Sequence, residues 1–205
     1  MKITIISGGL REPSSTRLLA DRLAMAVTKD LEAQGEPVEL SYVELRPLAH
    51  AIMDAMLTGF GGGALEAAFE QIREADGVIA VTPAFNASFS GLFKSFFDVL
   101  PEETLADMPV LIGATGGTER HSLVLEHALR PMFSYLHAIV APRPVYAATG
   151  DFGAQSAQSG TALGNRITAA AADFTRVLRS CGPRSRRDAG EEELAAMQRL
   201  LTGEP

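Results

Sequence analysis

The chain has 205 residues, of which 46% are hydrophobic and 21% charged, a balance typical of one globular domain with a substantial core. Its formal net charge of −7 argues against a general nucleic-acid binder, because neutralising phosphates requires clustered lysine and arginine side chains. A single cysteine, Cys181, excludes an internal disulfide, and the N-terminal apolar run is too short for a signal peptide or a membrane span; together these features predict a cytoplasmic protein.

Apolar periodicity predicts five strands alternating with five helices over residues 1–180. Short apolar runs mark the strands, and apolar residues at helical spacing mark the helices. In chain order, the expected elements are a strand at 3–6, a helix at 16–33, a strand at 38–45, a helix at 64–75, a strand at 77–81, a helix at 91–100, a strand at 109–114, a helix at 122–137, a strand within 139–148 interrupted by Pro142 and Pro144, and a helix at 166–180. Residues 46–63 and 150–160, rich in glycine and small residues, are expected to be irregular.

This alternation predicts an α/β fold with a doubly wound five-stranded parallel sheet, flavodoxin-like in its strand order 2-1-3-4-5. In such a sheet, ligands bind beyond the carboxyl ends of the strands, in the crevice next to strands 1 and 3. Residues 1–180 are expected to form one domain. Residues 181–205 form a tail of different composition, which is either a mobile, solvated end or a subunit-contacting helix.

The segment after the first strand has the composition of an anion site. Glycines lead into hydroxyl residues and a helix start, where backbone N–H groups and the helix dipole attract a phosphate. An arginine in the same segment can add charge-assisted hydrogen bonds. The candidate residues are Arg11, Ser14, Ser15 and Thr16. An ordinary β–α turn with a serine helix cap explains the same residues, and neither a G-x-G-x-x-G motif nor a P-loop is present.

The loops after the third and fourth strands suit a flat, hydrogen-bonding ligand such as a flavin ring. Small residues around one aromatic and one asparagine leave backbone groups accessible at Pro83, Ala84, Phe85, Asn86 and Ala87. The next loop, Thr115-Gly116-Gly117-Thr118, can direct several N–H groups at one acceptor, such as the negative charge that a reduced flavin develops at N1 and O2. Plain turns rich in proline, asparagine and glycine are the alternative for both segments.

The sequence gives little support to two other chemistries. The four histidines lack the i, i+4 spacing of a zinc-binding helix, so no metal site is expected. No G-x-S-x-G motif is present, so a serine hydrolase is not expected either.

Together, the three loops resemble those of the NAD(P)H-dependent FMN reductases of the flavodoxin-like superfamily. That family's first two patterns are roughly Gly-Ser-x-Arg-x-x-Ser and Pro-x-Tyr-x-x-x-x-Ser-Gly-x-x-Lys-x-x-x-Asp. The matching residues here are Gly8-Gly9-Leu10-Arg11-Glu12-Pro13-Ser14, then Pro83, Phe85, Ser90, Gly91, Lys94 and Asp98, then Ala114-Thr115-Gly116-Gly117-Thr118 with His127-Ala128-Leu129-Arg130-Pro131. The resemblance covers about residues 1–148 and is nearest the branch that feeds reduced FMN to two-component monooxygenases, including those for alkanesulfonates.

The chain departs from the family pattern at three positions. Gly9 replaces a hydroxyl residue, so phosphate binding must depend on Arg11, Ser14 and Thr16. Phe85 replaces a tyrosine and keeps only its ring. His127 stands where related reductases often have an aromatic residue, on a helix that packs between subunits in the family. It is therefore expected either at a subunit interface or as a partly exposed helical histidine.

The resemblance implies that FMN lies in the crevice, with its phosphate on the first loop and its ring on residues 83–87 and 115–118. It implies hydride transfer from NADPH or NADH to flavin N5, with no catalytic side chain required because the cofactors supply the chemistry. It also implies a homodimer or homotetramer that supplies a flavin-dependent monooxygenase. Two alternatives remain: a reductase of quinones, azo dyes or metal oxyanions that retains its FMN, and a non-enzymatic flavodoxin-like electron carrier. The Thr-x-Thr-Gly-x-Thr loop typical of flavodoxins is absent.

Overall fold

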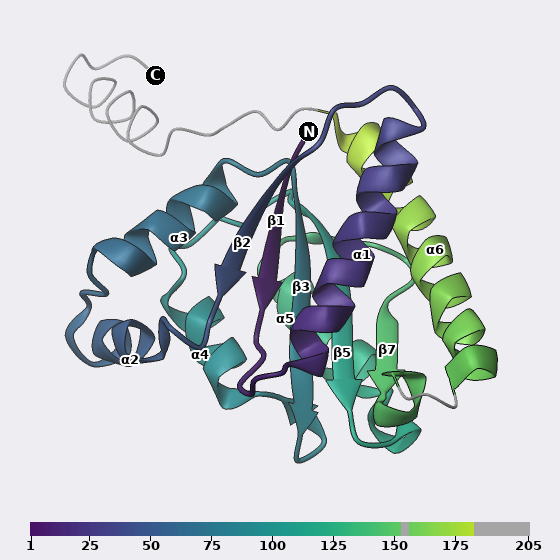
Figure 1. The fold of residues 1–205 in the computed structure, drawn as a ribbon. Coiled ribbons are helices and arrows are strands. Elements are labelled where there is room, and N and C mark those ends of the chain that lie inside the picture. Colours follow the sequence, from purple (N-terminus) through teal and green to yellow (C-terminus); the bar gives the residue numbers. More distant parts are fainter. Residues whose placement is uncertain (153–155, 183–205) are drawn as a thin grey trace.

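A parallel sheet forms the centre of the protein (Figure 1) in a computed structural model that describes residues 1–152 and 156–182. Its strands are β1 (Lys2–Ser7), β2 (Glu39–Glu44), β3 (Gly77–Phe85), β5 (Pro109–Gly116), β6 (Ile139–Val140) and β7 (Val145–Ala148). They are ordered β2-β1-β3-β5, and both β6 and β7 pair with β5. Because β6 and β7 together act as a fifth strand, the predicted flavodoxin-like order is confirmed.

Two prolines divide this fifth strand. Val140 pairs with Val110 in β6, and Val145 pairs with Gly113 in β7. Pro142 and Pro144 lie between them and have no N–H group to donate to the β5 ladder. Pairing therefore stops after β6 and resumes at β7, where the chain again has N–H groups to offer.

Helices cover both faces of the sheet, and each face has its own apolar core (Figure 1). On one face lie α1 (Ser15–Glu32) and α6 (Ser156–Cys181). On the other lie α2 (Ala49–Thr58), α3 (Gly63–Arg73), α4 (Gly91–Val99) and α5 (Arg130–Tyr135). Successive residues of β3 alternate between the two cores, since side chains in a strand point to opposite faces: Val78 and Ala80 face one core, and Ile79 and Val81 the other.

Several predicted boundaries are wrong. Residues 46–63 are not irregular throughout, because they contain α2, whose only buried residue is Ile52, and one buried residue leaves little periodic signal. Residues 150–160 are not all loop, because they include the end of a 3₁₀ turn, η3 (Thr149–Phe152), and the first residues of α6.

The predicted helix at 122–137 is interrupted. The chain passes through a 3₁₀ turn, η1 (Glu119–His121), and a π-helical turn, η2 (Leu125–Leu129), before α5 begins. Pro131, at the start of α5, cannot donate the next helical hydrogen bond, and the Arg130 N–H instead donates to the carbonyl of Leu125, five residues back.

None of the helices in the described residues is long and apolar enough to cross a membrane. The predicted tail, apart from Cys181 and Gly182, lies outside the described residues, and its role stays a prediction.

Candidate functional site

Three loops meet at the carboxyl edge of the sheet because their strands are parallel and adjacent. Ser7 of β1 pairs with Val81 of β3, and Thr82 of β3 pairs with Ala114 of β5. The segments that follow β1, β3 and β5 therefore emerge side by side, as the strand order predicted.

The β1–α1 loop is held by two close contacts. The Gly8 N–H donates to the Val81 carbonyl at 2.8 Å. Ser14 caps α1, its Oγ accepting from the Arg17 N–H at 3.1 Å. A Cβ at Gly9 would lie 2.1 Å from Ser14 Oγ, so glycine at position 9 leaves the room that this cap occupies. The Ser14 hydroxyl uses its oxygen in the cap and keeps its proton to donate to a ligand.

Arg11 is the cation of this loop that is free to bind an anion. It is exposed and makes no hydrogen bond or ion pair with any other residue in the described part of the chain. Arg17, in the first turn of α1, is occupied: its Nε donates to Asp21 at 2.8 Å, another of its nitrogens pairs with Glu44, and its guanidinium lies 4.3 Å from the centre of the Tyr42 ring.

A cavity of about 520 Å³ opens beside this loop, on the β2 side. Its walls include Arg11 and Ser14 from the loop and Arg46 from the segment after β2. Arg46 pairs with Glu12 at 2.7 Å across the opening. Arg11 is thus the arginine of this cavity whose charge no described carboxylate balances.

The other two hydroxyl residues predicted on this loop differ in their surroundings. Ser15 is exposed at the start of α1. Thr16 is buried, and its Oγ1 lies 2.8 Å from Oγ1 of Thr115, which is also buried, at the end of β5. This hydrogen bond joins the predicted phosphate loop to the predicted ring loop. Only one hydroxyl can donate within the pair, so the other keeps its proton for a further acceptor.

The segment after β3 is a hairpin rather than the plain loop that the sequence predicted. β3 continues to Phe85, turns at Asn86 and Ala87, and pairs with β4 (Ser88–Phe89). Both turn residues have positive φ, 47° and 65°, as a two-residue hairpin turn requires. Pro83 is buried and Ala84 half-buried, whereas Phe85 is 43% exposed and the turn residues are exposed. The hairpin presents the Phe85 ring at the edge of the sheet.

The loop after β5 offers free backbone donors. Gly117 and Thr118 are exposed and follow the last paired residue, Gly116. Their N–H groups donate to no other group among the residues that the structure describes. Two adjacent free N–H groups at the carboxyl edge can bind an anionic or carbonyl acceptor.

One residue that the sequence analysis missed lies directly behind this loop. The hydroxyl of Tyr146, in β7, donates to the Thr118 carbonyl at 2.8 Å. Burial raises the pKa of the Tyr146 phenol, so the group keeps its proton at neutral pH. No sequence motif marks this tyrosine, because its partner lies on another segment of the chain.

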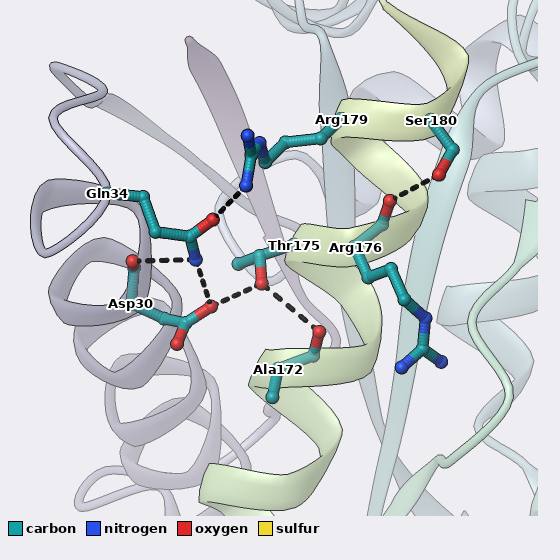
Figure 2. Close-up of a pocket in the computed structure, with 7 residues that line it drawn as sticks. All are labelled: Asp30, Gln34, Ala172, Thr175, Arg176, Arg179 and Ser180. Carbon is teal, nitrogen blue, oxygen red and sulfur yellow. Dashed lines mark hydrogen bonds between the residues drawn. The ribbon is translucent and has the colours of Figure 1, made fainter.

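A second cavity lies at the opposite end of α1 (Figure 2), between α1 and α6. Its polar side chains bind one another. Gln34 Nε2 donates to Asp30 Oδ2 at 3.0 Å, while Thr175 donates to Asp30 and Arg179 donates to Gln34. No predicted site residue lines it. These bonds tie the two helices together and leave few groups for a ligand.

The loop geometry agrees with a comparison against protein-family models: the model of the NADPH-dependent FMN reductases matches residues 1–153. The chain belongs to this family. Among the described residues of the reductase, no group of three histidine, cysteine, aspartate or glutamate side chains could hold a metal ion.

Two curated relatives and one solved structure are similar to this chain over most of their own length. The reductase is 37% identical to the FMN reductase (NADPH) of Pseudomonas aeruginosa, over 74% of this chain and 78% of that one. It is 36% identical to the NADH-dependent FMN reductase SfnE of Pseudomonas putida, over 83% and 89% of the two chains. An oxidoreductase structure from Corynebacterium diphtheriae is 42% identical with a TM-score of 0.82, covering 87% of this chain and 97% of that one.

Proposed function

We propose that this reductase binds FMN at the carboxyl edge of the sheet, reduces it with NADH or NADPH, and passes reduced FMN to a partner flavin-dependent monooxygenase. The observation that carries the proposal is the set of unpaired donors there. Arg11 and the Ser14 hydroxyl lie on one loop, and the N–H groups of Gly117 and Thr118 lie on the neighbouring loop.

The β1–α1 loop provides what a phosphate needs. Arg11 supplies a charge that no described carboxylate neutralises, and Ser14 supplies a hydroxyl proton. Ser15 and Thr16 lie in the first turn of α1, where the helix dipole favours a negative group. Ser15 adds an exposed hydroxyl, whereas Thr16 acts together with Thr115.

The hairpin and the β5 loop would hold the ring. Pro83 to Ala87 form one wall, and the free N–H groups of Gly117 and Thr118 can bind ring acceptors and stabilise negative charge there. When bound, FMN supplies the atom that accepts a hydride from the reduced nicotinamide. The side chains proposed for the site orient the two reactants and take no proton, so we assign no catalytic side chain.

The relatives differ in the nicotinamide that their names give, NADPH for the Pseudomonas aeruginosa enzyme and NADH for SfnE. We therefore propose both as electron donors for this chain. The proposal of a monooxygenase partner rests on the resemblance to reductases of two-component systems.

We also propose a homodimer or homotetramer. Apolar side chains around the π-helical turn support it, since Leu123 is 61% and Tyr135 84% exposed. His127 is exposed on the same turn.

The test is steady-state oxidation of NADPH and of NADH by the purified protein, with and without added FMN. Oxidation that rises and saturates with micromolar FMN is expected, because flavin is then a substrate that leaves after reduction. An oxidation rate that does not change with added FMN and that requires a quinone or dye would instead identify a reductase that retains its flavin. Absence of oxidation under every condition would leave an electron carrier.

A further inference from the structure

Tyr146 tethers the loop that carries the free N–H groups. The residue is 8% exposed and belongs to the core on the α2–α5 face of the sheet, so its position is fixed by packing. Its hydroxyl reaches past the end of β5 and donates to the Thr118 carbonyl at 2.8 Å. The loop is therefore held at two points, by strand pairing at Gly116 and by this hydrogen bond at Thr118.

The Tyr146 hydroxyl also explains why the chain needs glycine at position 116, the first of two adjacent glycines. A Cβ at Gly116 would lie 2.1 Å from the Tyr146 hydroxyl oxygen and 3.2 Å from the ring carbon that bears it. No side chain other than hydrogen fits while the tyrosine holds this position. A Cβ at Gly117 would meet nothing within 4 Å, so the requirement is specific to Gly116.

The geometry points to a new role for Tyr146: we propose that it is a positioning residue, which acts through the Thr118 carbonyl to hold the Gly117 and Thr118 N–H groups toward a bound flavin. This inference rests on the proposed function, because it takes the FMN ring to lie against this loop. Without this hydrogen bond the loop would be more mobile before binding. Ordering it around flavin would then cost conformational entropy and weaken binding.

The first test is Tyr146→Phe, which removes the hydroxyl and keeps the buried ring. Titration of flavin fluorescence should show roughly threefold weaker binding of oxidised FMN, and anaerobic equilibrium dialysis should show roughly tenfold weaker binding of dithionite-reduced FMN, whose fluorescence is too weak to titrate. The larger loss is expected for the reduced form because its negative charge depends more on the N–H groups. Thr58→Val removes a hydroxyl that donates to the Asp54 carbonyl at 2.7 Å in α2, away from the proposed site, and should alter neither value.

The second test uses the contact with Gly116. Gly116→Ala alone should weaken FMN binding, since its methyl group displaces the tyrosine hydroxyl. In the double variant Gly116→Ala/Tyr146→Phe the 2.1 Å contact with the hydroxyl oxygen is gone and only the 3.2 Å contact with the ring carbon remains, so FMN should bind more tightly than to Gly116→Ala and nearly as well as to Tyr146→Phe. Losses that simply add would overturn the inference.

The outcomes separate this inference from the proposed function. Wild-type protein that binds no FMN refutes the proposed site itself. Wild-type protein that binds FMN, together with a Tyr146→Phe variant of unchanged affinity for both flavin forms, refutes only the positioning role. Equal losses for oxidised and reduced FMN also refute it, since they indicate a general structural defect. If Tyr146→Phe does not fold, Gly116→Ala decides the question, because its methyl group displaces the tyrosine hydroxyl while the ring stays: unchanged affinity for both flavin forms would refute the positioning role.

Discussion

Removing the Arg11 guanidinium should weaken FMN binding, because the guanidinium no longer contacts the FMN phosphate, and should leave binding of the ring unchanged. A hydrogen bond to a charged group contributes about 1.5–3 kcal/mol. Arg11 is exposed on its loop, so water competes with the phosphate and the lower end of that range applies. Arg11→Ala should therefore raise the Kd for FMN roughly tenfold. Because no described carboxylate pairs with Arg11, the substitution leaves no other charge unbalanced.

Fluorescence titration at fixed ionic strength measures this loss, and riboflavin, which has the same ring without the phosphate, isolates its origin. Arg11→Ala should bind riboflavin as the wild type does. The matched control is Glu12→Gln/Arg46→Gln, which removes an ion pair of the same cavity without changing its net charge and should change FMN affinity little. Unchanged FMN affinity in Arg11→Ala, or an equal loss for riboflavin, would refute a phosphate contact.

Three further predictions concern stability, pH and assembly. Thr115→Val leaves the buried Thr16 hydroxyl without its partner and should lower the free energy of unfolding by about 1–3 kcal/mol in urea titrations, whereas Thr115→Ser should retain most of it. Hydrogen bonding by Arg143 lowers the pKa of the buried Asp173 carboxyl, so its stabilisation is present above the unfolded pKa of about 3.9 and is lost as pH falls through the lower folded value. In urea titrations from about pH 5 down to about pH 2, Asp173→Asn should make the free energy of unfolding fall less steeply with pH, and an unchanged slope would contradict this assignment. His127→Ala should shift the mass distribution in light scattering, and an unaltered mass would place His127 on a free surface.

Much of the candidate site could be predicted because the loops that form it have a recognisable local composition. Glycine, proline and hydroxyl residues after apolar runs identified the three loops, and parallel pairing brings such loops to one edge. The sequence could not show that residues 83–89 form a hairpin, since its turn depends on positive φ at Asn86 and Ala87, and alanine gives no signal for that conformation. It also missed α2, which buries only Ile52.

The sequence by itself determined the alternation of strands and helices, the flavodoxin-like sheet and the membership of the FMN reductase family, because periodicity and loop composition are local properties of the chain. Only the tertiary structure decided which donors remain free. Thr16 meets Thr115 across 99 positions, Arg17 is paired while Arg11 is not, and Tyr146 reaches Thr118 across 28 positions. Such contacts depend on how distant segments pack together, which no local pattern specifies.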